Sequence, residues 1–299
     1  MQSAMIQMCP ICNSTEWKIE YEGPVRDGVF GKYDDGTVWR CIDCGVSHLP
    51  PRQSNLEDYY QSDEYREDVG EKADPQDFFS RHDDEQFDKA RFLKGTSIRG
   101  KVIADIGCAG GSFLDVAKGL AETSIAIEPG KSYHASLRER GHRAYSSLAA
   151  ASEEWAGKVD VAVCFSVIEH VNDPVEFLTS IGHLLKPDGV LVLSTPNHRD
   201  ALLEFSGDPY RSFFYRWVHP WYFDEDCLRS ASIKCGMTFE PHYVQRFGFA
   251  NFAAWLRDGK PTGNDHGAAL GSVFDDVWKS TLESQKKSDY LYGFCRPAV

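Results

Sequence analysis

The sequence predicts an α/β protein, with a doubly wound, mostly parallel seven-stranded sheet preceded by a small cysteine-rich ribbon. Two observations predict this class. From Gly100 onward, short apolar runs alternate with helix-like segments, which is the pattern of a parallel sheet covered by helices on both faces. Before that point, two C-x-x-C pairs lie within the first 50 residues, with strand-like runs between them.

Composition and charge exclude several classes of protein. The chain has 299 residues, of which 42% are hydrophobic and 26% charged, as in an ordinary globular protein of one or two domains. No run approaches the ~18 apolar residues of a membrane span, and residues 1–5 lack the basic and apolar regions of a secretory signal. We therefore expect a cytoplasmic protein with no membrane partner. A net charge of -13 argues against a nucleic-acid partner.

Changes in composition suggest three regions. Residues 1–51 form the ribbon, which Pro50 and Pro51 close because consecutive prolines stop regular structure. Residues 52–95 form a helical connecting segment, and residues 96–299 form the α/β domain, with a helical insert at about 248–289.

The connecting segment contains one well-marked helix. Asp74 is suited to cap it, Pro75 to occupy its first position and Gly95 to end it. Three phenylalanines are expected to anchor it to the core: Phe79, Phe87 and Phe92. Residues 55–88 hold 13 acidic side chains against three basic ones, a composition that indicates a solvated helical face.

The α/β domain is read from its apolar runs. The expected strands are 102–105, 124–128, 143–145, 159–165, 189–194, 238–245 and 290–295. One helix is expected to begin at Ser112, and three more are expected at 131–140, 174–185 and 224–235.

The two cysteine pairs predict a metal site. Cys9 with Cys12 and Cys41 with Cys44 each direct two thiolates at one ion, and Gly45 permits the tight turn that follows the second pair. Four thiolates close a tetrahedral zinc site with no open position, so the zinc is expected to be structural. An iron-sulfur cluster and free thiols are the alternatives.

The segment after the first α/β strand predicts a ligand-binding turn. Asp105 ends the strand, and small residues from Gly107 to Gly111 lead into a helix whose N–H groups face a ligand. The dinucleotide fingerprint G-x-G-x-x-G is missing here. Glu128 lies 23 residues after Asp105, at the end of the next strand, where an acidic side chain binds a ribose diol.

These motifs resemble those of the class I S-adenosylmethionine-dependent methyltransferases. The resemblance covers roughly residues 90–248 and the last strand, and it rests on the sequences Asp105-Ile-Gly-Cys-Ala-Gly-Gly, Ile-Glu128-Pro, Phe165-Ser-Val-Ile-Glu-His170-Val-Asn-Asp-Pro and Leu185-Lys-Pro-Asp-Gly. Ala109 stands where the usual D-x-G-x-G-x-G motif has its middle glycine.

The resemblance implies roles for particular residues. Gly107, Ala109 and Gly111 would line the methionine end of the cofactor, Asp105 would face its amino group, and Glu128 would hold its ribose. Phe165 and Ser166 would lie near the transferred methyl group, and the adenine contacts would fall at residues 146–148.

The four-cysteine ribbon resembles that of bacterial sugar methyltransferases. The resemblance implies methyl transfer to a sugar or nucleotide-linked sugar in polysaccharide or natural-product biosynthesis. The sugar C-methyltransferases carry a further C-terminal domain for which 299 residues leave no room, so a hydroxyl acceptor is expected.

An aromatic segment after the fifth strand is the expected acceptor wall. Nine aromatic residues lie between Phe205 and Phe223, and aromatic faces suit sugars or bases while arginine suits phosphate. The expected acceptor-binding residues are Arg211, Tyr215, Arg216 and Trp221. His170 and His219 are the candidates for the general base that takes the hydroxyl proton. The alternative interpretation is that the aromatics pack a loop or the interface of a homodimer.

Other functions remain open from the sequence. The main alternative is an RNA or protein methyltransferase that docks its target with the ribbon, although residues 1–50 hold seven acidic against four basic residues. The two further alternatives are a non-catalytic scaffold and a nicotinamide oxidoreductase.

Overall fold

The computed structural model describes residues 8–52, 56–62, 64–93, 96–262 and 271–298. Its contacts divide the chain into two compact units. The sheet unit comprises Gln53–Leu193, Ser232–Phe239 and Phe294–Val299, and the ribbon unit comprises Met1–Arg52, Ser194–Ala231 and Glu240–Gly293. Within the described ranges, every helix is too short or too polar to cross a lipid bilayer.

A seven-stranded sheet organises the sheet unit, in the order β10-β11-β8-β7-β4-β5-β6. The strands are β4 (Val102–Ile106), β5 (Thr123–Ile127), β6 (Arg143–Tyr145), β7 (Val159–Phe165), β8 (Leu185–Pro196), β10 (Met237–Val244) and β11 (Tyr290–Pro297). β4 pairs in parallel with β5 and with β7, and β5 with β6. The residues of β8, β10 and β11 are divided between the two units. The expected strands and fold class are confirmed.

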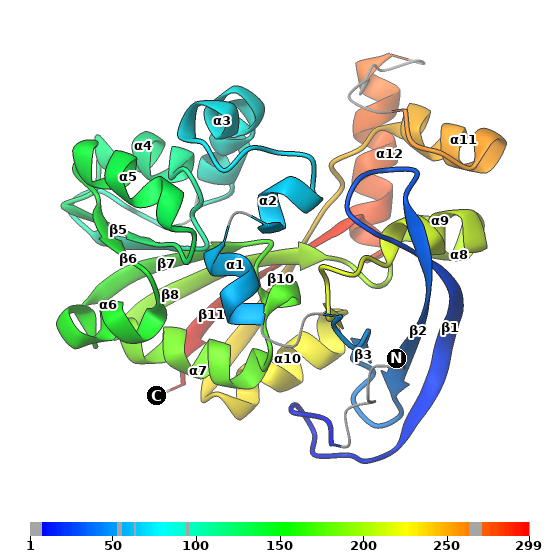
Figure 1. The fold of residues 1–299 in the computed structure, drawn as a ribbon, viewed down its shortest axis with the longest axis horizontal. Coiled ribbons are helices and arrows are strands. Elements are labelled where there is room, and N and C mark those ends of the chain that lie inside the picture. Colours follow the sequence, from blue (N-terminus) through cyan, green and yellow to red (C-terminus); the bar gives the residue numbers. More distant parts are fainter. Residues whose placement is uncertain (1–7, 53–55, 63, 94–95, 263–270, 299) are drawn as a thin grey trace. The chain divides into compact units, whose positions relative to one another are not determined.

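Helices cover both faces of this sheet (Figure 1). One face carries α3 (Pro75–Phe92), α4 (Ser112–Lys118) and α5 (His134–Glu139), and the other carries α6 (Leu148–Trp155) and α7 (Pro174–Leu184). The shorter elements are α1 (Leu56–Gln61), α2 (Glu64–Asp68), η1 (Lys131–Tyr133) and η2 (Ile168–His170). The sequence did not predict α6, which Ser147 caps by accepting a hydrogen bond from the Ala150 N–H at 3.1 Å.

Helix α3 begins as the sequence predicts, but one of its expected anchors is wrong. The Asp74 carboxylate accepts hydrogen bonds from the N–H groups of Gln76 and Asp77, while the expected stop at Gly95 lies outside the described residues. Phe92 packs against the core, whereas the Phe87 side chain is 62% exposed. Phe78 takes its place, because residues nine positions apart lie on opposite sides of a helix with 3.6 residues per turn.

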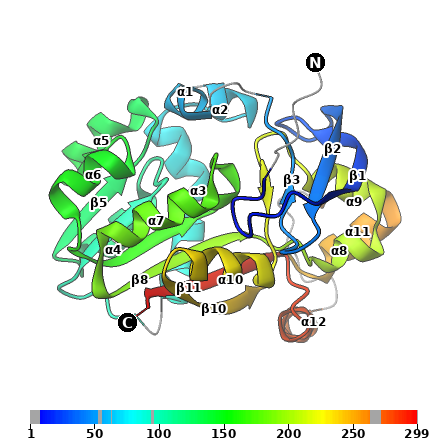
Figure 2. The same ribbon diagram turned by 90° about the horizontal axis from the view of Figure 1, so that it is seen from below.

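A four-stranded antiparallel sheet organises the ribbon unit, in the order β1-β2-β3-β9. Its strands are β1 (Trp17–Arg26), β2 (Tyr33–Cys41), β3 (Ser47–His48) and β9 (Trp221–Tyr222). Figure 2 shows β1 and β2 as two long strands lying side by side. β3 pairs with β9, so that Ser47 and His48 lie beside Tyr222 and Trp221. A distant part of the chain therefore completes the sheet of the ribbon unit.

The ribbon unit also contains helices from two later segments. These are α8 (Ala201–Phe205), α9 (Asp208–Phe214), α11 (Phe249–Asp258) and α12 (Ser272–Ser284), while α10 (Glu225–Lys234) is divided between the units. The expected helical insert thus contains α11 and α12. Short helices replace part of the expected loop after β8, because Asp200 caps α8 and Gly207 turns the chain with a φ of 63°.

Candidate cofactor site and metal centre

The turn after β4 requires small residues at defined positions. Gly107 and Gly111 have φ values of 73° and 82°, in the left-handed region that favours glycine. A Cβ atom on Gly107 would lie 2.5 Å from a Val167 methyl carbon, and one on Gly111 would lie 2.5 Å from Leu137. Ala109 also adopts a positive φ, of 47°, so the usual glycine conformation is kept there at a small cost in strain.

Two buried carboxylates lie at this turn. The Glu128 carboxylate accepts hydrogen bonds from the N–H groups of Ala109 at 2.7 Å and Gly130 at 2.8 Å. Burial raises the pKa of Asp105 to about 7, with Lys89 lowering it and Glu128 raising it further. Burial also raises the pKa of Glu128, against the effect of its two backbone hydrogen bonds and Arg66. The site therefore favours a ligand that brings a positive charge and hydrogen-bond donors.

The structure brings the predicted cofactor residues into one place. β4 lies between β5 and β7, where the direction of strand order changes, and ligands of open α/β sheets bind at such a point beyond the carboxyl ends of the strands. Phe165 ends β7, and its ring contacts Phe113 edge-on at 5.5 Å. Ser166 follows with a φ of 56°, a rare conformation for a residue other than glycine.

Two basic residues that the sequence motifs do not indicate lie beside this site. The Arg66 guanidinium hydrogen-bonds to Glu71 at 2.7 Å and lies over the rings of Tyr65, Phe78 and Tyr133 at 5.2 to 5.6 Å. The Lys89 ammonium lies 5.6 Å from the centre of the Phe165 ring and lowers the pKa of Asp105.

Arg66 belongs to residues 55–88, for which the sequence predicts a solvated helical face, and Lys89 directly follows them. That expectation is wrong at Arg66, whose side chain is only 16% exposed. Aromatic residues are interleaved with the charged residues of this stretch, and this pattern could have indicated that part of it is buried.

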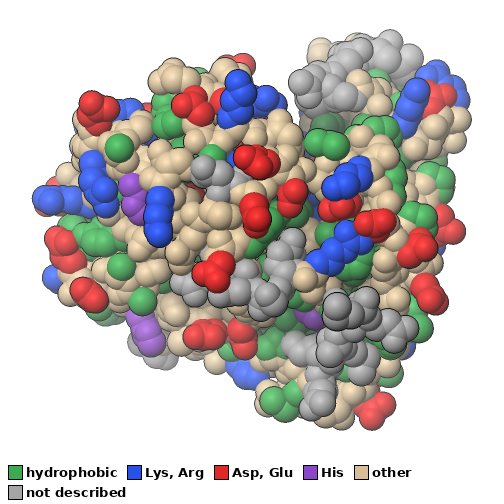
Figure 3. All heavy atoms as spheres, viewed as in Figure 1, with side chains coloured by type: hydrophobic (Ala, Val, Ile, Leu, Met, Phe, Trp, Pro, Cys, Tyr) green, Lys and Arg blue, Asp and Glu red, His purple; other side chains and the backbone are tan. Residues whose placement is uncertain are grey.

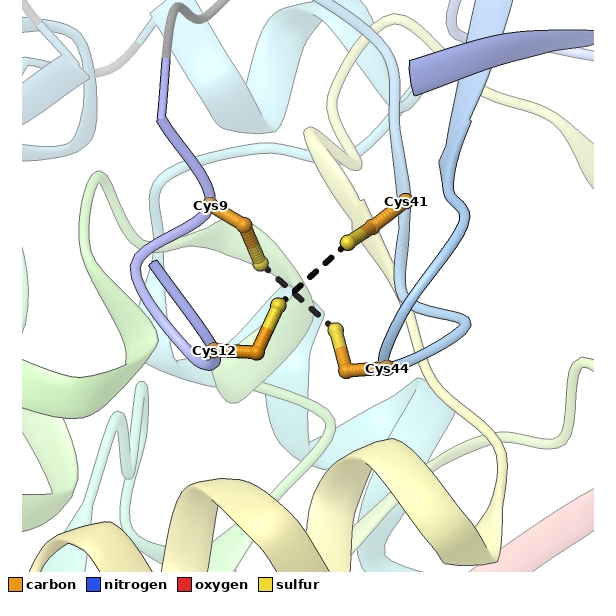
Figure 4. Close-up of side chains that lie close together, drawn as sticks. All are labelled: Cys9, Cys12, Cys41 and Cys44. Atoms are coloured by element: carbon orange, nitrogen blue, oxygen red, sulfur yellow. Dashed lines mark hydrogen bonds between the residues drawn. The ribbon is translucent and has the colours of Figure 1, made fainter. Parts of the chain in front are cut away.

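The four cysteines of the ribbon gather at one point (Figure 4). The sulfur atoms of Cys9 and Cys44 are 3.5 Å apart, those of Cys12 and Cys41 are 3.4 Å apart, and all four lie within 4.8 Å of one another. Four thiolates about 2.3 Å from a zinc ion would lie about 3.8 Å apart. The hydrogen bond with Cys44 lowers the pKa of the Cys9 thiol to about 5, whereas burial raises the pKa of Cys12 to about 11 and the hydrogen bond with Cys9 raises the pKa of Cys44. The support for zinc is therefore the geometry of the four sulfurs.

The two cysteine knuckles have the same backbone construction. Each second cysteine is followed by a residue with positive φ, Asn13 at 63° and Gly45 at 80°. Each first cysteine accepts a hydrogen bond at its carbonyl oxygen, Cys9 from the Asn13 N–H at 2.9 Å and Cys41 from the Gly45 N–H at 3.1 Å. The cluster therefore fits a tetrahedral metal ion held by four sulfurs.

Comparisons with known proteins identify the family. A family model described as a methyltransferase domain matches residues 79–238, just over half of the chain. The chain belongs to the methyltransferase-domain family. The ubiquinone biosynthesis O-methyltransferase of Caulobacter vibrioides is 32% identical over 174 residues, which are 54% of this chain and 69% of that protein. The mitochondrial ubiquinone biosynthesis O-methyltransferase of Schizosaccharomyces pombe is 36% identical over 113 residues, 35% of this chain and 41% of that protein.

The fold agrees with this assignment. A crystal structure of an S-adenosylmethionine-dependent methyltransferase from Archaeoglobus fulgidus superposes with a TM-score of 0.50 at 14% identity, covering 73% of this chain and 97% of the other. The chain is an S-adenosylmethionine-dependent methyltransferase. Its cofactor fits the site described above, because the buried carboxylates at the turn favour a cation and a diol and the glycines allow close approach.

The two candidate bases of the methyltransferase are both buried. His170 lies in η2 of the sheet unit, where its Nδ1 is 2.8 Å from the Tyr60 hydroxyl and its ring meets Tyr60 and Tyr65 edge-on. His219 lies in the ribbon unit, 5% exposed, with its ring centre 6.2 Å from that of Tyr222.

The expected acceptor residues lie together in the ribbon unit but differ in exposure. Tyr215 and Trp221 are 2% and 1% exposed, and Tyr215 belongs to a buried aromatic cluster with residues of β1 and β2. Arg211 is half-exposed and pairs with Asp208 at 3.1 Å. Arg216 is half-buried beside Tyr215. Most of the aromatic segment therefore packs the interior of this unit.

Proposed function

We propose that this methyltransferase transfers a methyl group to a hydroxyl of a small molecule, a sugar or nucleotide-linked sugar. The observation that carries the methyl-transfer part of the proposal is the pair of buried carboxylates, Asp105 and Glu128, beside a left-handed glycine turn that suits the cofactor. An oxygen acceptor is supported by the names of the relatives, which are O-methyltransferases. The sugar rests on the likeness of the four-cysteine ribbon to that of sugar methyltransferases.

The chain's own residues would hold and orient the cofactor. S-adenosylmethionine, when bound, supplies an electrophilic methyl group on a sulfonium. In the proposal, Asp105 receives the amino group and Glu128 the two ribose hydroxyls, while Gly107, Ala109 and Gly111 let the backbone approach the methionine end. Phe165 and Ser166 bound the space next to the methyl group. Burial of the two carboxylates limits the access of water to them, which strengthens their polar contacts.

A hydroxyl acceptor must lose a proton, and His170 is our first candidate for the base. Its ring is held by the Tyr60 hydroxyl and by two edge-on tyrosine contacts, which fixes its orientation. His219 is the second candidate. If either is the base, its replacement by alanine should lower kcat far more than it weakens cofactor binding. Full activity in both variants would leave proton removal to solvent.

The proposed zinc ion would be structural, because four sulfurs leave no open coordination position. The alternative, a ribbon that docks RNA, is not favoured by charge. Residues 1–50 hold seven acidic and four basic side chains. On the face drawn in Figure 3, acidic and basic side chains of the described residues are interspersed rather than gathered into a basic field.

Calorimetry with S-adenosylhomocysteine tests the cofactor site. The wild-type protein should bind it, and Glu128→Ala should weaken binding at least tenfold, because a charged hydrogen bond contributes about 1.5–3 kcal/mol. Glu139→Ala, an exposed acidic residue on α5, is the matched control and should bind as the wild type does. Equal affinity in the two variants would remove Glu128 from the site.

A transfer assay tests the acceptor. Labelled S-adenosylmethionine would be offered with a panel of thymidine- and uridine-diphosphate sugars, and with the same sugars lacking the nucleotide. Transfer to oxygen of a sugar is expected. Transfer to an RNA or protein in place of every sugar would support the alternative.

A further inference from the structure

Two arginine side chains of the ribbon unit lie next to each other. Arg26 ends β1, and Arg216 follows α9. Their backbones pair as a parallel bridge, in which the Arg26 N–H donates to the Tyr215 carbonyl and the Trp217 N–H donates to the Arg26 carbonyl, both at 3.1 Å. Residues paired in this way project their side chains from the same face, so the two positive charges face the same space.

Among the described residues, neither guanidinium has a partner of opposite charge. Within the part of the chain that the structure describes, neither side chain forms an ion pair or a hydrogen bond, and the Nε atoms of both are buried without an acceptor. The nearest acidic residue in sequence, Asp27, is already paired with Lys32 at 2.9 Å and Arg52 at 3.5 Å. Burial and the charge of Arg216 lower the pKa of Arg26 to about 9, so the side chain remains charged at neutral pH.

Two neighbouring, half-buried cations without a counter-charge are costly for a folded protein. In a purely structural cluster, the arginines would be expected to reach a carboxylate, as Arg40 does with Glu20 at 3.2 Å in the same unit. Both side chains are only half-buried, so a ligand can reach them. The Arg26 guanidinium carbon also lies 3.9 Å from the centre of the Phe213 ring, a cation–π contact that restrains the side chain.

We propose that Arg26 and Arg216 together form a binding site for the phosphate group of an anionic ligand. Two forked guanidiniums match the charge and the several acceptor oxygens of a phosphate or diphosphate better than those of a single carboxylate. Both arginines of this phosphate site belong to the ribbon unit. Arg211 is excluded from this pair, because it is bound to Asp208.

Binding and stability measured together test the site. Calorimetry and thermal unfolding of the full-length protein would use sodium pyrophosphate and thymidine diphosphate as probes, with sodium chloride at matched ionic strength. Wild-type protein should bind both probes, and Arg26→Met and Arg216→Met should each weaken binding at least tenfold. Arg257→Met, whose side chain is 80% exposed and paired with Asp258, is the matched control and should behave as the wild type.

The unfolding temperature without ligand separates this proposal from a structural role. Removing one of two repelling, unpaired charges should leave that temperature unchanged or raise it, whereas losing a structural arginine should lower it. If Arg26→Met fails to fold, Arg216→Met and Arg26→Lys, which keeps the charge but loses the fork, carry the test.

Three results would overturn the proposal: wild-type affinity in the foldable variants, equal stabilisation by chloride, or a lower unfolding temperature without loss of probe binding. Tighter binding of thymidine diphosphate than of pyrophosphate would point to a nucleotide as the phosphate carrier, and the reverse order would point to the bare diphosphate. S-adenosylhomocysteine affinity, measured in the same variants, tests the proposed function separately and should not change.

Discussion

Asp105 is buried where β4 ends, and this burial raises its pKa from the ordinary value of 3.8 to about 7. For a group whose pKa is higher in the folded than in the unfolded state, the related stability is fully present below the unfolded pKa. It is lost as the pH rises through the folded pKa. The cofactor-free protein should therefore become less stable between about pH 4 and pH 7, because the unfolded chain releases this proton near pH 4 while the buried carboxyl group keeps it up to about pH 7.

Asp105→Asn should stabilise the cofactor-free protein and impair cofactor binding. At pH 8 the neutral amide avoids the cost of a buried charge, so the free energy of unfolding should rise, by on the order of 1–4 kcal/mol. Affinity for S-adenosylhomocysteine should fall at least tenfold, since the amide offers no charge to an amino group. Denaturant unfolding and calorimetry measure the two effects, with Asp188→Asn, an exposed acidic residue, as control. A destabilised variant would contradict the assigned cost.

Helix α3 shows what local sequence can and cannot predict. Its start follows from Asp74 and Pro75, because capping depends on neighbours in the chain. The buried face of α3 cannot be predicted locally, because Phe78 and Phe87 are the same residue type. Only the packing of the sheet unit decides which of them is covered. In the same way the glycine turn and the four cysteines were readable from spacing. The positions of Arg66 and Lys89 beside the cofactor turn were not, because the carboxylates whose pKa they lower, Glu128 and Asp105, are distant in sequence.

His82 on α3 should make the stability of the sheet unit depend on pH. Burial alone would lower its pKa, but hydrogen bonds with Glu71 and Glu85 outweigh this and raise it from 6.5 to about 9. The stabilisation is full below pH 6.5 and is lost as the pH rises through 9. His82→Gln should cost about 1–2 kcal/mol at pH 6, allowing for the 25% exposure of the side chain, and much less near pH 9.5. Urea unfolding at several pH values measures this, and His242→Gln, beside Glu240 at an exposed position, should show no such trend.

The cysteine knuckles should depend on metal. One zinc ion per chain is expected in the purified protein, and Cys41→Ser should lose it and destabilise the ribbon unit, because the cluster's remaining sulfurs cannot close a tetrahedral site. Cys235→Ser, which lies outside the cluster, is the control and should retain the zinc. Metal analysis of freshly purified wild-type protein that finds no zinc would contradict the site.

The two compact units of the whole molecule are not continuous in the chain. The ribbon unit draws on three segments, and its sheet is completed when Trp221 and Tyr222 pair with His48 and Ser47. A pairing across more than 170 residues leaves no local pattern, so the sequence predicts the aromatic run but not its burial against β1 and β2. The doubly wound sheet was predictable because each strand and helix follows its neighbour in the chain.

The positions of the two candidate sites predict separate responses to their ligands. The residues proposed to bind the cofactor lie in the sheet unit, and the four cysteines lie in the ribbon unit. A ligand stabilises the folded state that holds it by RT ln(1 + [L]/Kd). S-adenosylhomocysteine at 100 times its Kd should therefore add about 2.7 kcal/mol to protection of the sheet unit. Hydrogen exchange measured by mass spectrometry should show slower exchange in residues 102–130 when this ligand is bound.

Chelation of zinc should speed exchange in residues 9–48, where the cysteine knuckles are. Faster exchange in residues 102–130 on chelation alone, with the ribbon unchanged, would contradict the assignment of both sites.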